Sequence, residues 1–495
     1  MLLTCVALAW HGLASQHSRQ KAVSEFYLHH DHVIGTSLDV WVTAHDEAAA
    51  DAAESAILAE IERLRKIFSL YDTDSELSRL NRTREPMVVS SEMIEVLKLY
   101  DAFHVRTHGA FNGQLGELVR VWKEAERTQL EPDDATLSKI VQQLRQTPWQ
   151  IDEANRTVTR LTDQPLNLNS IAKGYIIQKA AAAVKSASIE GLLLNLGGDM
   201  IAVGKNGWTI GVQDPHQPQD NAPTIARIRL NGGTIATSGG YERFYTVNGK
   251  RHSHIFDPRT GRSATGAASA TVIARDNVTA NALATTLCVL TPEEGLHLIA
   301  AMPGVECFLV GQDGKQYRSA GFALLEVPAE PIAAVQDKKD VKAGDPWAAD
   351  YQVNFTITIP SVTSKKYRKP YVAVWVENAD AKPVRTISVW GSNPRWISTL
   401  PQWWKIGRDD TKLVKAVTRA TRAPGKYSLV WDGKDDKGNL LSQGTYTVHV
   451  EVHREHGKLV RQTGKLTCNG EPAELKLAKN AETGETLVEY VKKKK

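Results

Sequence analysis

Residues 232–261 read GGTIATSGGYERFYTVNGKRHSHIFDPRTG and form the densest run of reactive and turn-forming side chains in the chain. Their TSGGYERF segment offers hydroxyls and glycine amides, and an Asn-Gly hairpin signal then leads into HSHIFDPRTG, which carries His254 and Asp257 beside a proline turn. The stretch is too polar for a core element and too rich in functional groups for an idle loop. We therefore expect the chemistry of the protein to lie here.

The composition is that of an ordinary soluble globular protein. The chain has 495 residues, 42% hydrophobic and 23% charged, which is typical of two or three packed domains. A net charge of only +4 favours neither a nucleic-acid nor a membrane-surface partner. No nucleic acid is therefore expected among its partners.

The four cysteines are scattered along the chain without the spacing of a metal site. This argues against zinc and against a disulfide framework. Cys288 and Cys307 stand in apolar surroundings, so we expect both to be buried, inert thiols.

Residues 1–19 combine a short apolar run with small residues, but they lack the positive charge that opens a secretory signal. They indicate a weak or truncated export signal. No other stretch reaches the length of a transmembrane helix, so any membrane association is expected only through this segment.

The pattern divides the rest of the chain into two domains. Residues 20–328 alternate between helical and strand patterns, residues 329–347 form a linker rich in Ala, Pro, Asp and Lys, and residues 348–495 end in a basic, solvated tail. The first domain is predicted to be α+β. Its expected strands are 36–42, 192–196, 208–212 and 270–273, and its expected helices are 47–68, one opening at Ser90, 113–126, 170–186 and 281–290.

The second domain is predicted to be an all-β, immunoglobulin-like sandwich. Short strand patterns such as VNFTITI and TYTVHVEV are separated by turn signals. Seven of the twelve tryptophans lie from Trp347 onward, and they favour a packed core over a sugar- or peptide-binding platform. Residues 427–451 resemble the immunoglobulin-like repeat of flagellar hook-capping proteins, with Trp431 as the core anchor and glycines shaping the turns. The domain carries no catalytic signature of its own.

Several polar segments of the first domain suit a nucleotide. In FSLYDTDSELSRLN (residues 68–81), Tyr71 is placed to stack on a planar ring. The glycine turn GAFNGQLG (109–116) and the helix start NLNSIAKGY (167–175) present backbone amides, which suit phosphate groups, and Lys173 adds a point charge. Taken singly, each segment also has an ordinary structural interpretation as a turn or a solvated side chain.

The order of these segments resembles the flavin transferase family, the bacterial FAD-dependent protein FMN transferases first described as thiamine-biosynthesis lipoproteins. The counterparts of the family pattern are Gly35-Thr36, 68–81, 109–116, 167–175, 195–199 (NLGGD), 237–261 and 280–285. These seven ordered matches span roughly residues 30–325. The later β region resembles a predicted periplasmic domain of unknown function that is found fused to some of these transferases.

The resemblance implies a magnesium-dependent enzyme that splits the pyrophosphate of FAD and passes FMN to a threonine or serine hydroxyl of a partner, releasing AMP. Phosphoryl transfer needs positioning and charge neutralisation more than covalent help. His254 is the candidate base for the acceptor hydroxyl. Asp257 either orients that imidazole or shapes the turn, and Tyr71 and Phe111 are the expected walls for a ring.

The candidate site residues fall into three groups. The expected catalytic residues are His254 and Asp257. The expected cofactor-binding residues are Thr36, Tyr71, Ala110, Phe111, Asn112, Asn167, Lys173, Thr237, Ser238, Gly239, His254 and Ile255. The expected magnesium ligands are Ser170, Asn281 and Thr285.

The sequence departs from the family pattern in charge. Asn112, Asn167 and Asn281 stand where the family pattern has Asp, and the last of these is one of the implied metal ligands. Because Mg²⁺ prefers carboxylate and phosphate oxygens, an amide at residue 281 is expected to bind it more weakly unless the phosphates of FAD supply the difference.

Alternatives to the transferase stay open at this point. The chain could be a catalytically weak or silent FAD-binding protein, an FAD pyrophosphatase releasing FMN and AMP, or a structural adhesion protein, which would leave the seven segments unexplained. As a transferase, it is expected in the periplasm or cell envelope, with an acceptor flavoprotein or FMN-binding domain as its partner.

Overall fold

The computed structural model describes residues 23–185, 189–204, 207–217, 219, 221–222, 224–241, 243–328, 345–361, 369–391, 394–419, 421–455 and 457–493. The proposed signal segment 1–19, most of the expected linker (329–344) and residues 494–495 of the basic tail lie outside this part.

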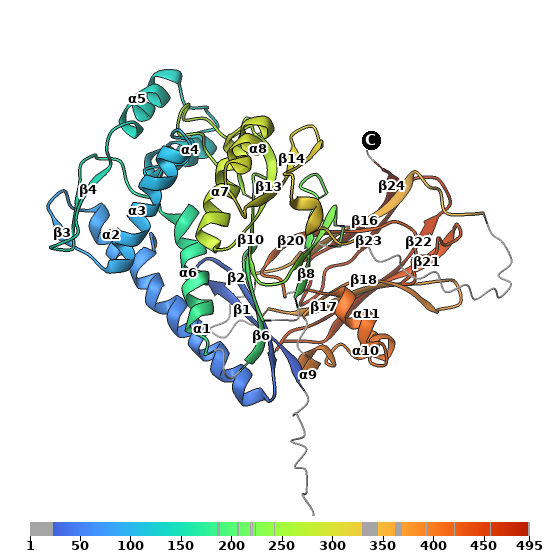
Figure 1. Ribbon diagram of the computed structural model, residues 1–495. Coiled ribbons are helices and arrows are strands. Elements are labelled where there is room, and N and C mark those ends of the chain that lie inside the picture. The colour runs from blue at the N-terminus through green and yellow to red at the C-terminus, as the bar shows by residue number, and fades with distance from the viewer. Residues whose placement is uncertain are drawn as a thin grey trace, which may run out of the picture.

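The N-terminal domain is built on one antiparallel sheet of eight strands, in the order β1-β2-β6-β7-β10-β13-β14-β15 (Figure 1). The inner strands carry nearly continuous runs of buried residues, as in β13, where all eight residues are buried. Because successive side chains point to opposite faces, both faces of the sheet lie against a core. The strands are β1 (Ser24–Val33), β2 (Thr36–Ala44), β6 (Ile189–Leu196), β7 (Asp199–Gly204), β10 (Gly233–Gly239), β13 (Ala267–Ala274), β14 (Glu306–Gly311) and β15 (Gln316–Arg318).

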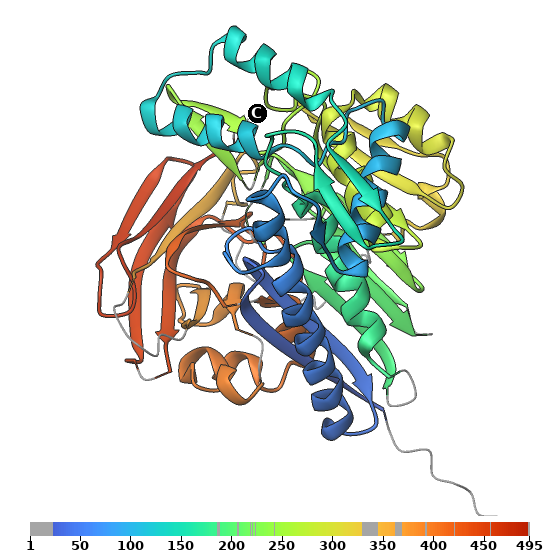
Figure 2. The ribbon, with the colours of Figure 1, turned by 90° about the vertical axis from the view of Figure 1, so that its left-hand side faces the viewer.

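Helices cover one face of this sheet. Leu38, Val40 and Val42 of β2 pack in one core cluster with Ile57 and Leu64 of the long helix α1. Helices α1 and α6 lie side by side along the sheet (Figure 2). The helices of the N-terminal domain are α1 (Glu47–Phe68), α2 (Glu76–Asn81), α3 (Ser91–Arg106), α4 (Gly116–Thr128), α5 (Asp134–Leu144), α6 (Asn169–Ala183), α7 (Asn277–Val289) and α8 (Pro292–Ala300), with a short 3₁₀ turn, η2 (Phe322–Leu324).

The opposite face of the sheet is covered by a two-stranded ribbon, β8 (Trp208–Val212) and β9 (Ala226–Leu230). A second core cluster joins Leu193 and Phe308 of the sheet to Ile210 and Ile228 of the ribbon. The sheet is therefore buried on both faces.

Two smaller units flank the helical layer. The hairpin β11 (Phe244–Val247) and β12 (Lys250–Ser253) turns at Asn248-Gly249, whose φ angles of 48° and 73° suit the Asn-Gly signal in the sequence. Its residue Val247 packs with Trp122 of α4 in a separate cluster. The other unit is a three-stranded sheet of β3 (Met87–Val88), β5 (Thr157–Arg160) and β4 (Trp149–Asp152).

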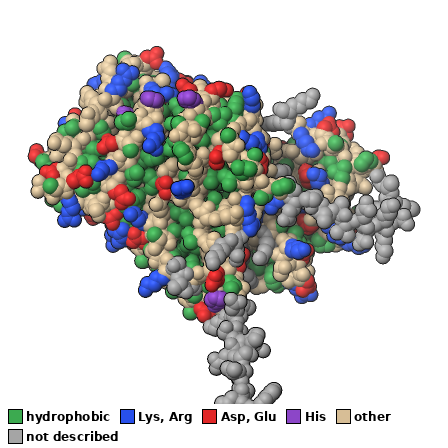
Figure 3. All heavy atoms as spheres, in the orientation of Figure 1, with side chains coloured by type: hydrophobic (Ala, Val, Ile, Leu, Met, Phe, Trp, Pro, Cys, Tyr) green, Lys and Arg blue, Asp and Glu red, His purple; other side chains and the backbone are tan. Residues whose placement is uncertain are grey.

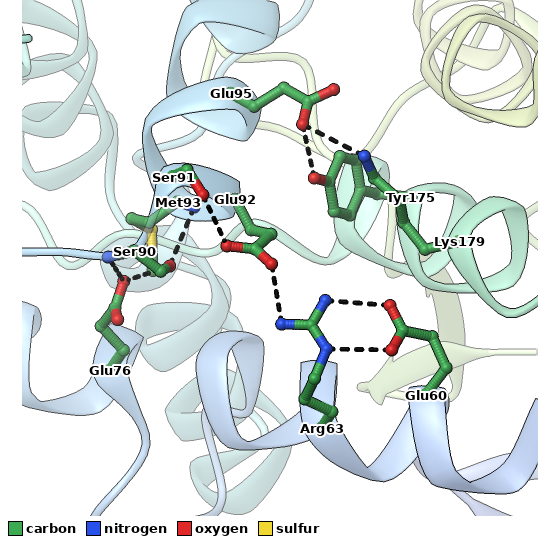
Figure 4. A network of polar contacts seen from close by, with 10 residues as sticks. All are labelled: Glu60, Arg63, Glu76, Ser90, Ser91, Glu92, Met93, Glu95, Tyr175 and Lys179. Carbon is green, nitrogen blue, oxygen red and sulfur yellow. Dashed lines mark hydrogen bonds and ion pairs between the residues drawn. The ribbon is translucent and has the colours of Figure 1, made fainter. Parts of the chain in front are cut away.

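Polar contacts tie the helices together at the surface (Figure 4). Arg63 of α1 contacts Glu60 on its own helix and Glu92 of α3, while Glu95 of α3 accepts from the Tyr175 hydroxyl of α6 at 2.6 Å. The Arg63 pairs are partly exposed and contribute little stability each, whereas Tyr175 is buried. These contacts link α1, α3 and α6.

The C-terminal domain is a sandwich of two sheets. One has the order β20-β16-β24-β23 and the other β19-β18-β17-β21-β22, and a shared core including Phe355, Val374, Trp431 and Tyr490 lies between them. The strands are β16 (Tyr351–Ile359), β17 (Tyr371–Glu377), β18 (Pro383–Trp390), β19 (Thr418–Arg419), β20 (Gly425–Trp431), β21 (Gly444–His453), β22 (Val460–Cys468), β23 (Ala473–Leu477) and β24 (Thr486–Lys492). The immunoglobulin-like topology stays a prediction.

The tryptophans of this domain pack as the sequence predicts. Five of the seven from residue 347 onward are buried at 2% exposure or less: Trp347, Trp375, Trp390, Trp403 and Trp431. Trp347, which the sequence places in the linker, belongs to this core. The folded domain therefore begins before residue 348.

The prediction of an all-β second domain is wrong in one region. Three short helices, α9 (Pro394–Ile397), α10 (Pro401–Gly407) and α11 (Thr411–Val417), cover the outer face of the second sheet. Trp403 of α10 packs there with Trp375 and Val389. The sequence does contain helix-start signals here, namely a proline at the start of α10 and the Asp410 cap of α11. Both helices are short and lie between strands, so their periodicity is weak.

The side chain of Asn221 links the two domains through a pair of hydrogen bonds to the backbone of a strand. The Asn221 amide, in the loop between β8 and β9, donates to the Val430 carbonyl at 2.5 Å and accepts from the Val430 N–H at 2.9 Å. Val430 lies in β20, an edge strand of the sandwich. The β8–β9 ribbon accordingly lies between the main sheet and the sandwich (Figure 1).

Acidic and basic side chains are interspersed on the face shown in Figure 3, as the small net charge suggests. Among the described residues, no helix combines the length and the apolar character needed to cross a membrane.

Candidate active site

The site is organised around the Gly197-Gly198 turn between β6 and β7. Both glycines have positive φ, 56° and 93°, which favours glycine over other residues. A side chain at Gly197 would collide with Thr36 at the start of β2, and the Gly198 N–H donates to the Asn195 side chain at 2.9 Å. The antiparallel order of β2, β6 and β7 thus brings Thr36 against the NLGGD turn.

Three side chains from three elements meet beside this turn. Lys173 of α6 donates to the Gly197 carbonyl at 3.0 Å and forms an ion pair with Asp199 Oδ2 at 2.9 Å. Asn281 of α7 donates through Nδ2 to the same Asp199 oxygen at 2.6 Å. The Lys173 side chain is 30% exposed and that of Asp199 only 1%. Lys173 keeps a third N–H for a ligand, but Asp199 already balances its charge.

Burial dominates the electrostatics of Asp199. It raises the pKa of the carboxyl group, while the Lys173 ammonium and the Asn281 amide lower it. Asp199 Oδ1 is buried and has no hydrogen-bond partner among the described residues. The sequence assigned no role to Asp199, although a charged residue directly after a Gly-Gly turn and at the start of a buried strand was a usable signal.

The end of β10 supplies hydroxyl groups to the same region. Ser238 Oγ lies 3.4 Å from Thr285 Oγ1 of α7, and Thr237 Oγ1 lies 2.9 Å from Thr271 Oγ1 of β13. The strand ends at Gly239, where a side chain would press on the Ala268 carbonyl at 3.0 Å. The predicted residues 237–239 therefore line the strand end next to α7.

His254 follows the β11–β12 hairpin and is held by its backbone surroundings. Its Nδ1 lies 2.9 Å from the Arg243 carbonyl, which can only accept, so Nδ1 carries the proton and Nε2 is the basic nitrogen. Burial lowers the pKa of the imidazole, and the charges of Arg243 and Lys173 lower it further. The adjacent Ile255 is buried in the main core.

Asp257 does not orient His254 in this structure. Both of its carboxylate oxygens pair with the Arg259 side chain at 2.9 Å, and Oδ1 also accepts from the Arg259 N–H. Its own carbonyl accepts from Gly261 at 2.8 Å. The second alternative from the sequence, a residue that shapes the turn, is the one the geometry supports.

The GAFNG loop packs near the start of α6, and Tyr100 contacts both. Tyr100 of α3 stacks on Phe111 with a centroid distance of 5.0 Å, and its hydroxyl lies 2.9 Å from Ser170 Oγ. Phe111 is only 2% exposed and Ala110 3%. The expectation that Phe111 walls a flavin or adenine ring is therefore wrong, since its ring is packed inside the core.

The two asparagines near this loop also have structural partners. Asn112 donates to the Leu144 carbonyl at 3.1 Å and accepts from the Gln114 N–H at 2.8 Å. Asn167 accepts from the Asn169 N–H at 3.3 Å, and its own N–H donates to the Gly113 carbonyl at 2.7 Å. Asn167 thereby connects the GAFNG loop to the beginning of α6.

Unlike Phe111, Tyr71 presents an exposed aromatic ring. It follows the end of α1, and 88% of the residue is exposed. A ring so exposed has a free face for stacking.

The side chains at α6 and α7 have the oxygen donors that suit a hard cation. Asn281 and Thr285 of α7 offer an amide and a hydroxyl oxygen, and Ser170 of α6 offers a hydroxyl that also contacts the Tyr100 hydroxyl at 2.9 Å. The buried Asp199, whose Oδ1 has no hydrogen-bond partner among the described residues, adds negative charge next to Asn281. Oxygen donors are those that Mg²⁺ prefers. Among the described residues, no cluster of three or more His, Cys, Asp or Glu side chains could hold a metal ion.

Comparison with known proteins identifies the families of both domains. Residues 34–309 match the model of the ApbE family, and residues 352–485 match a family described as a predicted periplasmic protein (DUF2271). A relative in Vibrio cholerae, named FAD:protein FMN transferase, is 31% identical over 278 residues, which cover 53% of this chain and 81% of the relative. One in Klebsiella pneumoniae with the same name is 28% identical over 58% of this chain and 84% of its own length.

Solved structures share the fold of the N-terminal domain. The crystal structure of the ApbE protein from Thermotoga maritima superposes with a TM-score of 0.56 at 29% identity, covering 62% of this chain and all of that one. The flavin transferase ApbE from Vibrio cholerae gives a TM-score of 0.53 at 27% identity, with 61% of this chain covered.

Fold and site together define the class of protein: it is an enzyme of the flavin transferase type. The chain belongs to the ApbE family, with a predicted periplasmic domain following the transferase domain.

Proposed function

We propose that this protein transfers FMN from FAD to a threonine or serine hydroxyl of a partner flavoprotein and releases AMP. The observation that carries the proposal is His254, whose Nδ1 lies 2.9 Å from the Arg243 carbonyl, which leaves Nε2 as the basic nitrogen. A base held in this tautomer can take a proton from an acceptor hydroxyl. That hydroxyl oxygen then bonds to the FMN phosphorus as the bond to the AMP phosphate breaks.

The remaining residues bind and orient the substrate in this proposal. Lys173 uses its third N–H on the pyrophosphate, and the exposed Tyr71 ring stacks on a planar ring of FAD. Thr237 and Ser238 present hydroxyls at the end of β10. Charge neutralisation and positioning of this kind are what phosphoryl transfer demands most.

Magnesium would be held by Asn281, Thr285 and Ser170 and would neutralise charge on the pyrophosphate oxygens. The neutral Asn281 leaves this site without the carboxylate of the family pattern. The phosphates of FAD are then required to complete the coordination, so metal and FAD should bind cooperatively.

A covalent flavin assay tests the proposed function. The full chain is incubated with FAD, Mg²⁺ and an acceptor FMN-binding domain, and protein-bound flavin is followed by in-gel fluorescence and mass spectrometry, with AMP measured in parallel. Covalent FMN with one AMP per transfer supports the transferase. Tight FAD binding without covalent flavin would indicate a silent binding protein, and AMP without protein-bound flavin would indicate a pyrophosphatase.

The metal assignment predicts opposite effects of two substitutions in α7. Asn281→Asp is expected to lower the Mg²⁺ concentration needed for half-maximal transfer. The new carboxylate is a better Mg²⁺ ligand than an amide, and a bound cation relieves its repulsion with the Asp199 carboxylate. Thr285→Ala is expected to raise that concentration about tenfold or more, the size of effect typical of changes near a metal site. Titrating Mg²⁺ in the flavin assay measures both. Loss of all flavin binding in Asn281→Asp would show that the metal is misplaced.

The electrostatics of His254 predict the pH dependence of transfer. Because burial and neighbouring positive charges lower the pKa from its ordinary 6.5, the neutral base persists below that pH. The rate is therefore expected to be flat near pH 7 and to fall with a midpoint below 6.5 as the imidazole takes up a proton. Initial rates at saturating FAD across pH 5–8, with folding checked by circular dichroism, provide the measurement. A midpoint at or above 6.5 in the native protein would contradict this role of His254.

We place the reaction outside the cytoplasm, as supported by the predicted periplasmic family of residues 352–485. The acceptor would be a flavoprotein subunit or FMN-binding domain exposed in the same compartment.

A further inference from the structure

Asp199 is the one buried charge at the site that the proposed mechanism does not use. Its carboxylate is 1% exposed, Oδ2 accepts from both Lys173 and Asn281, and Oδ1 has no hydrogen-bond partner among the described residues. An unpaired buried oxygen is costly, typically about 1–3 kcal/mol. The structure maintains this arrangement directly beside the residue that departs from the family pattern.

Asn281, where the family pattern has Asp, must be oriented correctly to bind a cation, whereas a carboxylate need not be. Both ends of an aspartate side chain are oxygens, so either can face a cation. An asparagine has one oxygen and one NH₂ group, and only the oxygen binds a cation while the NH₂ group repels it. The orientation of the Asn281 amide therefore decides whether this residue is a ligand at all.

Asp199 determines that orientation. A carboxylate only accepts hydrogen bonds, and Lys173 Nζ, which only donates, lies 2.9 Å from the same oxygen that Asn281 approaches at 2.6 Å. The Asn281 NH₂ group must face Asp199, which turns Oδ1 of the amide away from the carboxylate. An asparagine at residue 199 would lack this property, because its own amide could present either an oxygen or an NH₂ group.

We propose that Asp199 is a positioning residue that holds the Asn281 amide with its oxygen toward the cation, so that a neutral side chain serves where the family pattern has a carboxylate. The inference rests on the proposed function for the assignment of Asn281 as a ligand. Partners of this kind, which orient a metal ligand, typically change metal affinity by about 10–100-fold when removed.

A double-mutant cycle separates positioning from simple charge. Mn²⁺ binding to the full chain is measured by electron paramagnetic resonance, alone and with saturating ADP, corrected for the Mn²⁺–ADP complex without protein. Asp199→Asn is expected to weaken Mn²⁺ binding about tenfold or more in the native background and by less than about twofold in the Asn281→Ala background. Equal weakening in both backgrounds would show that Asp199 acts as a ligand or by charge alone and would overturn the proposal, as would no weakening in the native background.

A charge swap covers the case in which Asp199→Asn folds poorly. In Asp199→Asn/Asn281→Asp, an amide still meets a carboxylate and the net charge is unchanged. This variant is expected to bind Mn²⁺ at least as tightly as the native chain, and binding as weak as in Asn281→Ala would overturn the proposal. Asp436→Asn, at a partly buried carboxylate of the sandwich, serves as the control that should leave Mn²⁺ affinity unchanged.

These measurements remain informative if the proposed function fails. A chain that shows the non-additive Mn²⁺ binding but forms no covalent flavin would refute the transferase activity and support the role of Asp199. A chain that forms covalent flavin but shows additive effects of the two substitutions on Mn²⁺ binding would support the transferase activity and refute the role of Asp199.

Discussion

Replacing His254 with alanine is expected to reduce FMN transfer by about 10²–10⁴-fold, the usual contribution of a general base. FAD binding should persist, because the groups assigned to the pyrophosphate and rings lie on other elements. The histidine is half-buried and its Nδ1 contact is with a backbone carbonyl, so the loss should change the chemistry more than the fold. Single-turnover rates of covalent flavin formation, with FAD affinity measured by fluorescence quenching, give the two quantities separately.

His252 is the matched control for this substitution. It lies two residues earlier, is 7% exposed and packs against Trp122 with a ring-centroid distance of 4.7 Å. His252→Asn should lower stability while leaving the transfer rate of the folded protein nearly unchanged. A His254→Ala variant that kept most of its rate, or a His252→Asn variant that lost it, would refute the assignment of His254 as the base.

Replacing Lys173 with methionine is expected to destabilise the transferase domain by about 2–3 kcal/mol. Removing one partner of a fully buried ion pair costs about 3–5 kcal/mol, and the 30% exposure of the Lys173 side chain reduces that figure. The buried Asp199 would be left with Asn281 alone as a hydrogen-bond donor. Denaturant unfolding followed by circular dichroism measures the change.

Lys179 provides the comparison on the same helix. It contacts Glu95 at 3.4 Å with both side chains exposed, so Lys179→Met should change the free energy of unfolding by less than about 0.5 kcal/mol. Equal effects of the two substitutions would mean that Asp199 is not held by Lys173 in solution.

Lys173→Met should also raise the pKa of His254 and move the pH midpoint of transfer upward, since the substitution removes a positive charge that lowers this pKa.

Local pattern predicted most elements of the N-terminal domain. The expected helix 47–68 matches α1, since its apolar positions recur at helical spacing and Asp46 caps its first turn. The expected helix 113–126 begins at Gly116 instead, because Gly113 and the Asn112 side chain form a loop before it. The expected helix 281–290 begins earlier, at Asn277, where Asp276 caps it. Helix starts depend on single capping contacts that periodicity does not reveal.

Side-chain partners were harder to predict than elements. The family resemblance predicts that Phe111 walls a ring of the ligand, yet Tyr100 and Phe103 pack against it. Asp257 was offered as a partner of His254, yet Arg259 two residues away takes both carboxylate oxygens. In both cases the residue type suits either role, and only the packing around it decides between them.

The sequence by itself determined the family, the order of the family's motif segments and the helix and strand patterns, because these depend on residues that are neighbours along the chain. The tertiary structure decided which of those residues meet. Thr36, Lys173, Asp199 and Asn281 come from four segments, and they converge only because β2, β6 and β7 are adjacent in the sheet and α6 and α7 pack together on one face. Residues 232–261 contain His254, the proposed base, but the contact that leaves Nε2 as its basic nitrogen and the contact between Asp199 and Asn281 exist only in the folded chain.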